Sequence, residues 1–105
     1  MDFRELRSSL RAMADLGRLR ILQYLARYDE TTVSSLTRGL RMSQPLASWH
    51  LRTLRRAGLI VTRRVGREVH CSLNRSRIEE CRQALAELML PAQSGAAHGS
   101  PDLPR

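Results

Sequence analysis

The most constraining feature of this 105-residue chain is the stretch SQPLASWHLRTLRR, at residues 43 to 56, which Gly58 follows closely. Ser43 is a favourable N-cap, and Pro45 fits a first helical turn because its missing N–H needs no intrahelical partner there. Gly58 is of the type that commonly follows a helix end. At about 100° per residue, one side of such a helix is largely apolar. That side holds Ala47, His50, Leu51, Leu54 and Ala57. We therefore predict an amphipathic helix over residues 43–57.

The opposite side of this helix is polar and basic. It holds Pro45, Ser48, Trp49, Arg52 and Arg56, with Arg55 at its flank. Gln44, Ser48 and Arg52 follow one another at intervals of one turn, as side chains do that reach base edges from a helix in a DNA groove. An exposed Trp49 is costly in water, so it either meets nucleic acid or folds back on a neighbouring element. His50 is expected to help fix the helix to the core.

The segments before this helix follow helical periodicity. Residues 2–14 and 18–28 carry apolar stripes at helical spacing, with Asp15 as a cap between the two helices and Gly17 as a break. DETTV is expected to be a polar turn, and residues 34–40 a short helix with Ser34 as N-cap. Arg41 occupies the tight turn that follows.

The segments that follow the helix over residues 43–57 change from a helical to a strand-like pattern. Residues 59–63 and 68–73 have strand composition, with Gly66 as the hairpin signal between them. Ser76 and Glu79 have capping-box spacing, which predicts a further helix that Pro91 ends. The predicted fold is mainly α with a small β-hairpin, in the order α-α-α-α-β-β-α. A short helix, a tight turn, a longer helix and a basic hairpin indicate a winged helix-turn-helix. We expect one domain over residues 1–90 and a disordered tail over 91–105, which is rich in Pro and Gly.

The charge is concentrated in the middle of the chain. The net charge is +8, every basic residue is Arg, and ten Arg lie between Arg38 and Arg77. Between Thr31 and Ile78 the only acidic residue is Glu68. Such a local excess is typical of a polyanion-binding surface, although a merely solvated basic surface has the same composition.

The stretches RLRILQYL, VSSLTRGLRMSQPLASWHLRTLRRAGLI and RRVGREVHCSL resemble the ArsR/SmtB family of bacterial winged-helix repressors. The resemblance implies a homodimer that binds a palindromic double-stranded DNA operator and usually represses transcription, with the wing, about 59–73, on flanking DNA. The residues expected at DNA are Arg41, Ser43, Gln44, Pro45, Ser48, Trp49, Arg52, Arg55, Arg56, Arg63, Arg64 and Arg67. The residues expected at a dimer interface, on the first and last helices, are Phe3, Leu6, Leu10, Met13, Ile78, Cys81, Leu85 and Leu88. The chain departs from the family pattern at Leu16, Arg41 and Cys71. Because the family often has Gly at the turn where this chain has Arg41, the resemblance implies a strained backbone there.

The sequence does not support a metal site of the kinds known in such regulators. Residues 31–40 contain no Cys, His, Asp or Glu, and the last helix contains no His or Asp. We therefore expect no metal and no cofactor, and the sequence identifies no inducer. A thiol switch at Cys71 or Cys81 is the remaining sensor hypothesis, against the alternative that both are small buried hydrophobic residues.

Two other classes of function have less support in the sequence than DNA binding. A winged helix could use the same face for a protein or RNA partner, with Trp49 and Pro45 as anchors. An enzyme is disfavoured because the sequence contains no Gly-rich phosphate loop and no recognisable catalytic set. No signal peptide or membrane-spanning segment is evident, so the expected location is the bacterial cytoplasm, at the nucleoid when DNA is bound.

Overall fold

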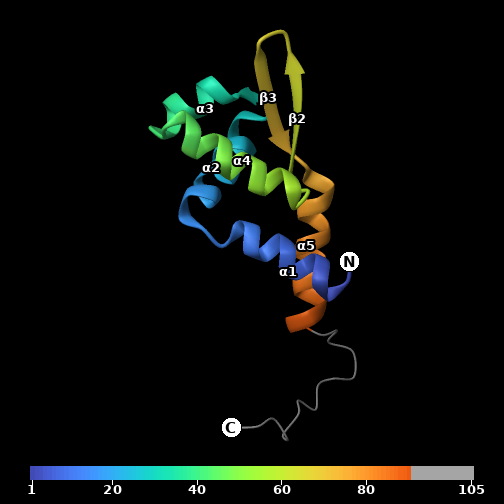
Figure 1. Ribbon diagram of the computed structural model, residues 1–105. Helices are drawn as coiled ribbons and strands as arrows, with labels where there is room; N and C mark the ends of the chain where they lie inside the picture. The colour runs from blue at the N-terminus through green and yellow to red at the C-terminus, as the bar shows by residue number, and fades with distance from the viewer. Residues whose placement is uncertain (91–105) are drawn as a thin grey trace, which may run out of the picture.

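The computed structural model describes residues 1–90, so the expectation for residues 91–105 lies outside the described part of the chain. The fold is a winged helix (Figure 1): five helices with a small antiparallel sheet, of which two strands form the protruding hairpin. The helices are α1 (Phe3–Met13), α2 (Leu16–Tyr28), α3 (Val33–Leu40), α4 (Gln44–Arg56) and α5 (Arg75–Met89). The strands are β1 (Thr31–Thr32), β2 (Ile60–Val65) and β3 (Glu68–Leu73). The predicted fold class is confirmed, with one strand added.

Two of the helix starts are capped as the sequence predicts, and a third, that of α1, has a cap that was not predicted. Asp15 accepts a hydrogen bond from the backbone N–H of Arg18, and Ser43 accepts one from that of Leu46. Asp2 forms a reciprocal capping box with Glu5 at the start of α1. Each such cap satisfies a backbone donor that has no partner within the helix.

Two predicted caps are wrong. The N-cap of α3 is Thr32, not Ser34, and its hydroxyl accepts from the backbone N–H of Ser35 at 3.1 Å. The N-cap of α5 is Asn74, not Ser76. The amide nitrogen of Asn74 also donates to the carbonyl of Gly58 at 2.9 Å, so this side chain ties the start of α5 to the chain that leaves α4. Asn74 therefore combines a local cap with a long-range contact that the local sequence pattern does not contain.

The DETTV segment is more than a turn. Thr31 and Thr32 form β1, which pairs antiparallel with Cys71 and His70 of β3. The sheet order is β1-β3-β2, so β3 is the central strand and the hairpin is attached to the body along one edge. A strand of only two residues is too short to show an alternating pattern in the sequence, so β1 was not predicted.

Arg41 and Gly17 are constrained for different reasons, one by backbone conformation and the other by close packing. Arg41 is the C-cap of α3 with φ 53° and ψ 47°, so the left-handed strain expected at this turn is confirmed, at a cost of about 1–2 kcal/mol. Gly17 was expected to break the chain between helices, but it lies in the first turn of α2. A Cβ at Gly17 would lie 2.9 Å from Nε2 of His50, so glycine is needed there for a close helix approach.

The core lies where α2, α3 and α4 pack against the sheet. Its fully buried members include Ile21, Leu25, Leu36, Leu54 and Leu59. The core is thus built from aliphatic side chains, as expected for a chain with only 4% aromatic residues. No helix in residues 1–90 is sufficiently long and apolar to cross a membrane.

The eight residues expected at a dimer interface divide into two groups. Leu6 and Cys81 are buried within the single chain, where α1 meets α5. Phe3 and Leu88 are exposed, with 72% of the Phe3 side chain area accessible. Leu10, Met13, Ile78 and Leu85 are half-buried against the core. The monomer's own packing therefore uses part of the two stripes, and Phe3 and Leu88 are the members left free.

Candidate nucleic-acid interface

The two faces of α4 are as the helical phase predicts. Ala47, His50, Leu51 and Leu54 are buried against the rest of the domain. The other face is solvent-accessible, and Ser48 lies half-buried at its edge. The exposed residues of that face are Gln44, Pro45, Trp49, Arg52, Arg55 and Arg56. The helix thus presents polar and basic groups at intervals of one turn while its apolar side fixes its position.

A shallow hollow of about 290 Å³ separates α4 from the sheet. Val33, Leu51 and Val69 supply its apolar floor, and Ser48, Arg52 and Arg55 reach it from α4. The structure therefore brings three of the predicted DNA-contacting residues together on the side of α4 that faces the hairpin. A hollow of this kind, open and rimmed by arginines, is suited to a polyanion and provides no enclosed catalytic pocket.

Trp49 both packs on the protein and remains accessible. Its side chain is 53% exposed, and the guanidinium carbon of Arg18 lies 5.5 Å from the ring centroid. This is a cation–π contact from the first turn of α2. The Trp49 and His50 ring centroids are also 5.1 Å apart. The two alternatives for Trp49 thus describe two parts of one side chain: a ring face contacted by Arg18 of α2 and an open part that a partner could meet.

Arg18 joins three elements at the base of α4. Its Nε donates to the carbonyl of Ala12 at 2.6 Å, and its Nη1 donates to Nδ1 of His50 at 3.1 Å. Because a guanidinium can only donate, Nδ1 of His50 must accept, so the proton of the neutral ring resides on Nε2. Nε2 lies 3.7 Å from a carboxylate oxygen of Asp15. The role of Arg18 could not be predicted from the sequence, because Trp49 and His50 are distant from it in the chain.

The electrostatics of this cluster favour a neutral His50. Burial lowers the pKa of His50; the nearby Asp15 carboxylate opposes that shift, and the Arg18 guanidinium adds to it. The pKa of Asp15 is itself held below its usual value, first by the hydrogen bond from the Arg18 backbone N–H. His50 is therefore a structural link between α2 and α4, as its place on the apolar side predicts.

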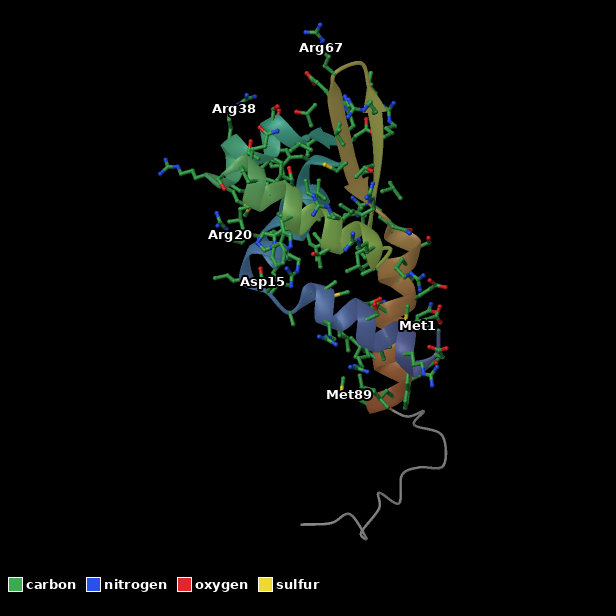
Figure 2. The ribbon with its side chains drawn as sticks, in the orientation of Figure 1. Met1, Asp15, Arg20, Arg38, Arg67 and Met89 are labelled. Atoms are coloured by element: carbon green, nitrogen blue, oxygen red, sulfur yellow. The ribbon has the colours of Figure 1, made fainter. Side chains whose placement is uncertain are left out.

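The hairpin carries Arg64 and Arg67 without ion-pair partners among residues 1–90. Gly66, with φ 63°, begins the two-residue turn between β2 and β3. Figure 2 shows Arg67 at the hairpin tip, pointing away from the body of the domain. The glycine was correctly identified as the turn signal, and the turn presents an exposed basic tip.

Arg63 differs from the other two hairpin arginines. Its guanidinium donates twice to the Glu30 carboxylate, at 2.9 and 2.8 Å. Glu30 also lies 3.5 Å from Nδ1 of His70. This acid, between α2 and β1, neutralises an arginine that the sequence assigned to DNA. Glu30 was missed because the pairing of β2 with β3 and of β3 with β1 is what places Arg63 beside it.

The remaining predicted contacts lie at the entry to α4. Arg41 is exposed at the left-handed C-cap of α3, next to the exposed Ser43 that caps α4. The Ser43 hydroxyl oxygen accepts the backbone N–H of Leu46 at 3.3 Å, and its own proton is still available as a donor.

The structure argues against a reactive thiol at Cys71. Cys71 is fully buried, and burial raises its pKa to about 11, so the thiol stays protonated at neutral pH. Cys81 is buried as well, with 2% of its area exposed. Within residues 1–90, no group of three or more His, Cys, Asp and Glu side chains is arranged to hold a metal ion.

Comparison with known proteins agrees with this geometry. The family described as "Bacterial regulatory protein, arsR family" matches residues 15–62, which contain α2 to α4 and the start of β2. The arsenic resistance transcriptional regulator ArsR1 of Pseudomonas putida is 41% identical over 61% of this chain and 50% of its own length. The transcriptional repressor SmtB homolog of Synechocystis sp. is 44% identical over 59% of this chain and 46% of its own length. The chain thus spans about half the length of these curated relatives.

The solved structure of HlyU from Vibrio cholerae matches along nearly its full length. It is 33% identical, with 85% of this chain and 98% of that chain covered and a TM-score of 0.69. The similarity therefore includes α1, the hairpin and α5 as well as the central helices. The chain belongs to the ArsR family of bacterial regulatory proteins, whose members are transcriptional regulators and not enzymes.

Proposed function

We propose that this protein is a sequence-specific, double-stranded-DNA-binding transcriptional repressor that acts at the bacterial nucleoid as a homodimer on a palindromic operator. The observation that carries the proposal is the exposed face of α4, where Gln44, Ser48 and Arg52 stand one turn apart beside a basic hairpin. α4 enters the major groove, and the hairpin lies on flanking DNA. The names of the SmtB homolog and ArsR1 support regulation of transcription.

The contacts divide into two kinds. Gln44, Ser48 and Arg52 are placed to read base edges, because they lie on the amino-terminal half of α4. Trp49 offers an open apolar surface to a sugar or a thymine methyl group. The arginines at the periphery of α4 and on the hairpin are placed to bind phosphates, which fix register without reading sequence. That set is Arg41, Arg55, Arg56, Arg64 and Arg67, and Arg63 joins it only when released from Glu30.

The homodimer is supported by the apolar residues that α1 and α5 leave uncovered. Met1, Phe3 and Leu88 line a hollow of about 270 Å³ between the two helices, and Met89 is also exposed. A second copy that covers these side chains by a two-fold axis places two α4 helices on one face, which matches a palindromic site.

The test is the salt dependence of binding to a specific and a random duplex. Six to ten phosphate contacts in a dimer predict that log K falls with log salt with a slope of about −5 to −9. Arg52→Ala should relax sequence preference, whereas Arg64→Ala should weaken specific and random DNA alike. A nearly flat slope would contradict the electrostatic part. Equal losses on both duplexes for both variants would contradict the division of roles.

A protein-interaction role is the second candidate, because Leu46 and Trp49 are 45% and 53% exposed on α4. The same assay separates the two candidates, since absence of binding to random duplex at low salt favours a protein partner.

A further inference from the structure

A second groove follows α4 on the side away from the hairpin. It consists of two adjoining hollows of about 310 and 340 Å³ between α1 and the carboxyl-terminal half of α4. Both hollows are lined by Ser8, Arg56 and Ala57, so they form one continuous surface. Arg4 reaches it at one end and Arg11 at the other. Figure 1 shows α1 and α4 side by side, and they are in contact. We call this surface the α1–α4 groove.

The arginines of α1 occupy a face of their own. Arg4, Arg7 and Arg11 recur at intervals of three and four residues and therefore share one stripe. At about 100° per residue, Arg4 and Arg11 lie roughly 100° around the helix from Phe3, which is exposed, and from Leu10, which is half-buried. Arg4 and Arg11 therefore lie on a different side of α1 from the exposed apolar side chain of Phe3. A second copy on the apolar face leaves the arginines accessible.

Three arginines of the α1–α4 groove are not neutralised by carboxylates of residues 1–90. No ion pair within residues 1–90 involves Arg4, Arg11 or Arg56. The one carboxylate at the groove, Glu5, accepts the backbone N–H of Asp2 at 3.0 Å and lies 3.9 Å from Arg77. The groove therefore presents three free guanidinium groups together with the Ser8 hydroxyl, a set of donors that suits phosphate oxygens.

If α4 lies in a major groove of B-DNA, a sugar–phosphate backbone also lies on this side of the helix. A helix in a major groove about 12 Å wide has a sugar–phosphate backbone along each of its flanks. Arg52, Arg55 and the hairpin lie on one flank of α4. Arg56 and the α1 arginines lie on the other.

We propose that Arg4 and Arg11 of α1, together with Arg56, bind the phosphodiester backbone of DNA on the flank of α4 opposite the hairpin. This inference rests on the proposed function, and it makes α1 a third DNA-contacting element whose contacts are independent of base sequence. The footprint then includes charge that lies outside the basic middle of the chain.

The first test compares Arg4→Ala/Arg11→Ala with Arg20→Ala/Arg27→Ala, which removes the same charge from another surface, on α2. Binding is measured by fluorescence anisotropy from low to high salt on random duplex DNA. Two lost contacts predict that the salt slope of the first variant falls by about 1.8 per bound chain. The second variant should keep the wild-type slope, and Arg4→Lys/Arg11→Lys should restore most of the loss.

The second test does not depend on removing a side chain that supports the fold. Ser8→Cys, labelled with an iron chelate that cleaves nearby DNA, should cut the backbone, because Ser8 is exposed in the α1–α4 groove. Gln23→Cys, on the other surface, should not. Equal slopes for the two Arg variants, or no cleavage from position 8, would overturn the inference while wild-type binding leaves the proposed function standing. Absence of wild-type binding at low salt would instead overturn the proposed function.

Discussion

The guanidinium carbon of Arg18 lies 5.5 Å from the ring centroid of Trp49, so a side chain of α2 holds the one tryptophan on the exposed face of α4. The same guanidinium donates to His50 and to the carbonyl of Ala12. The orientation of Trp49 and the position of α4 therefore depend on one residue outside the helix-turn-helix. Replacement of that residue is expected to affect both.

Arg18→Met keeps much of the side-chain length and removes the charge and the donors. We expect Trp49 fluorescence to shift to longer wavelength, and affinity for a specific duplex to fall more than affinity for a random one. The free energy of unfolding should fall by about 1–3 kcal/mol, because His50 and Ala12 lose a buried donor. Arg20→Met, on the same helix, is the control. An unchanged Trp49 spectrum in Arg18→Met would contradict the contact.

His50 predicts a pH dependence of stability. Burial lowers its pKa in the folded protein below the value near 6.5 of the unfolded chain, so the unfolded state takes up a proton first as the pH falls. The free energy of unfolding should therefore be fully present above about pH 6.5 and decrease on acidification, by at most about 1.4 kcal/mol per pH unit from this residue. Asp15 and Glu30, whose pKa values are also lowered, lose their contributions only at more acidic pH.

Urea unfolding of wild type and His50→Gln between pH 8 and pH 5.5 measures this effect. The variant should be less stable at pH 8 and should lack the decrease below pH 6.5. Parallel curves for the two proteins would exclude His50 as the source.

Gly17→Ala is expected to destabilise the protein although alanine normally favours a helix. The added Cβ would lie 2.9 Å from Nε2 of His50 and 3.1 Å from a carboxylate oxygen of Asp15. His50 is only 5% exposed and cannot move aside freely. We expect a loss of about 1–3 kcal/mol in thermal or urea unfolding. A stabilised variant would show that α2 and α4 are less closely apposed than the structure indicates.

Glu30→Gln should strengthen DNA binding without changing sequence preference. The substitution removes the carboxylate that holds Arg63 and frees that guanidinium for a phosphate. The expected result is tighter binding to specific and random duplexes alike, with a salt slope steeper by about 0.9 per bound chain. Glu79→Gln makes the same charge change beside Arg82 on α5, away from the hairpin, and is the matched control. Equal effects of the two variants would mean that the change in net charge alone accounts for the change in DNA affinity.

The sequence predicted those features that depend on near neighbours. The amphipathic phase of α4, the caps Asp15 and Ser43 and the turn at Gly66 are all set within a few residues. These features suffice to define the winged helix and the side of α4 that faces outward.

The features that the sequence did not predict depend on contacts between distant segments. Strand β1, the ion pair of Glu30 with Arg63 and the Arg18 contact with Trp49 each join parts of the chain that are about thirty or more residues apart. Local periodicity contains no information on such pairs, because they form only when the elements pack. The α1 arginines were overlooked for the same reason, since packing of α1 on α4 is what brings them beside Arg56.

The proposed function requires the exposed face of α4 to read a DNA sequence. Selection of duplexes from a random pool by the wild-type protein, followed by sequencing, tests it most directly, with Ser48→Ala/Arg52→Ala selected in parallel. The wild type is expected to enrich an inverted repeat with half-sites about one helical turn apart, and the variant to lose preference at defined positions within each half-site. Recovery of no enriched sequence by the wild type, or of the same sequence by both proteins, would contradict it.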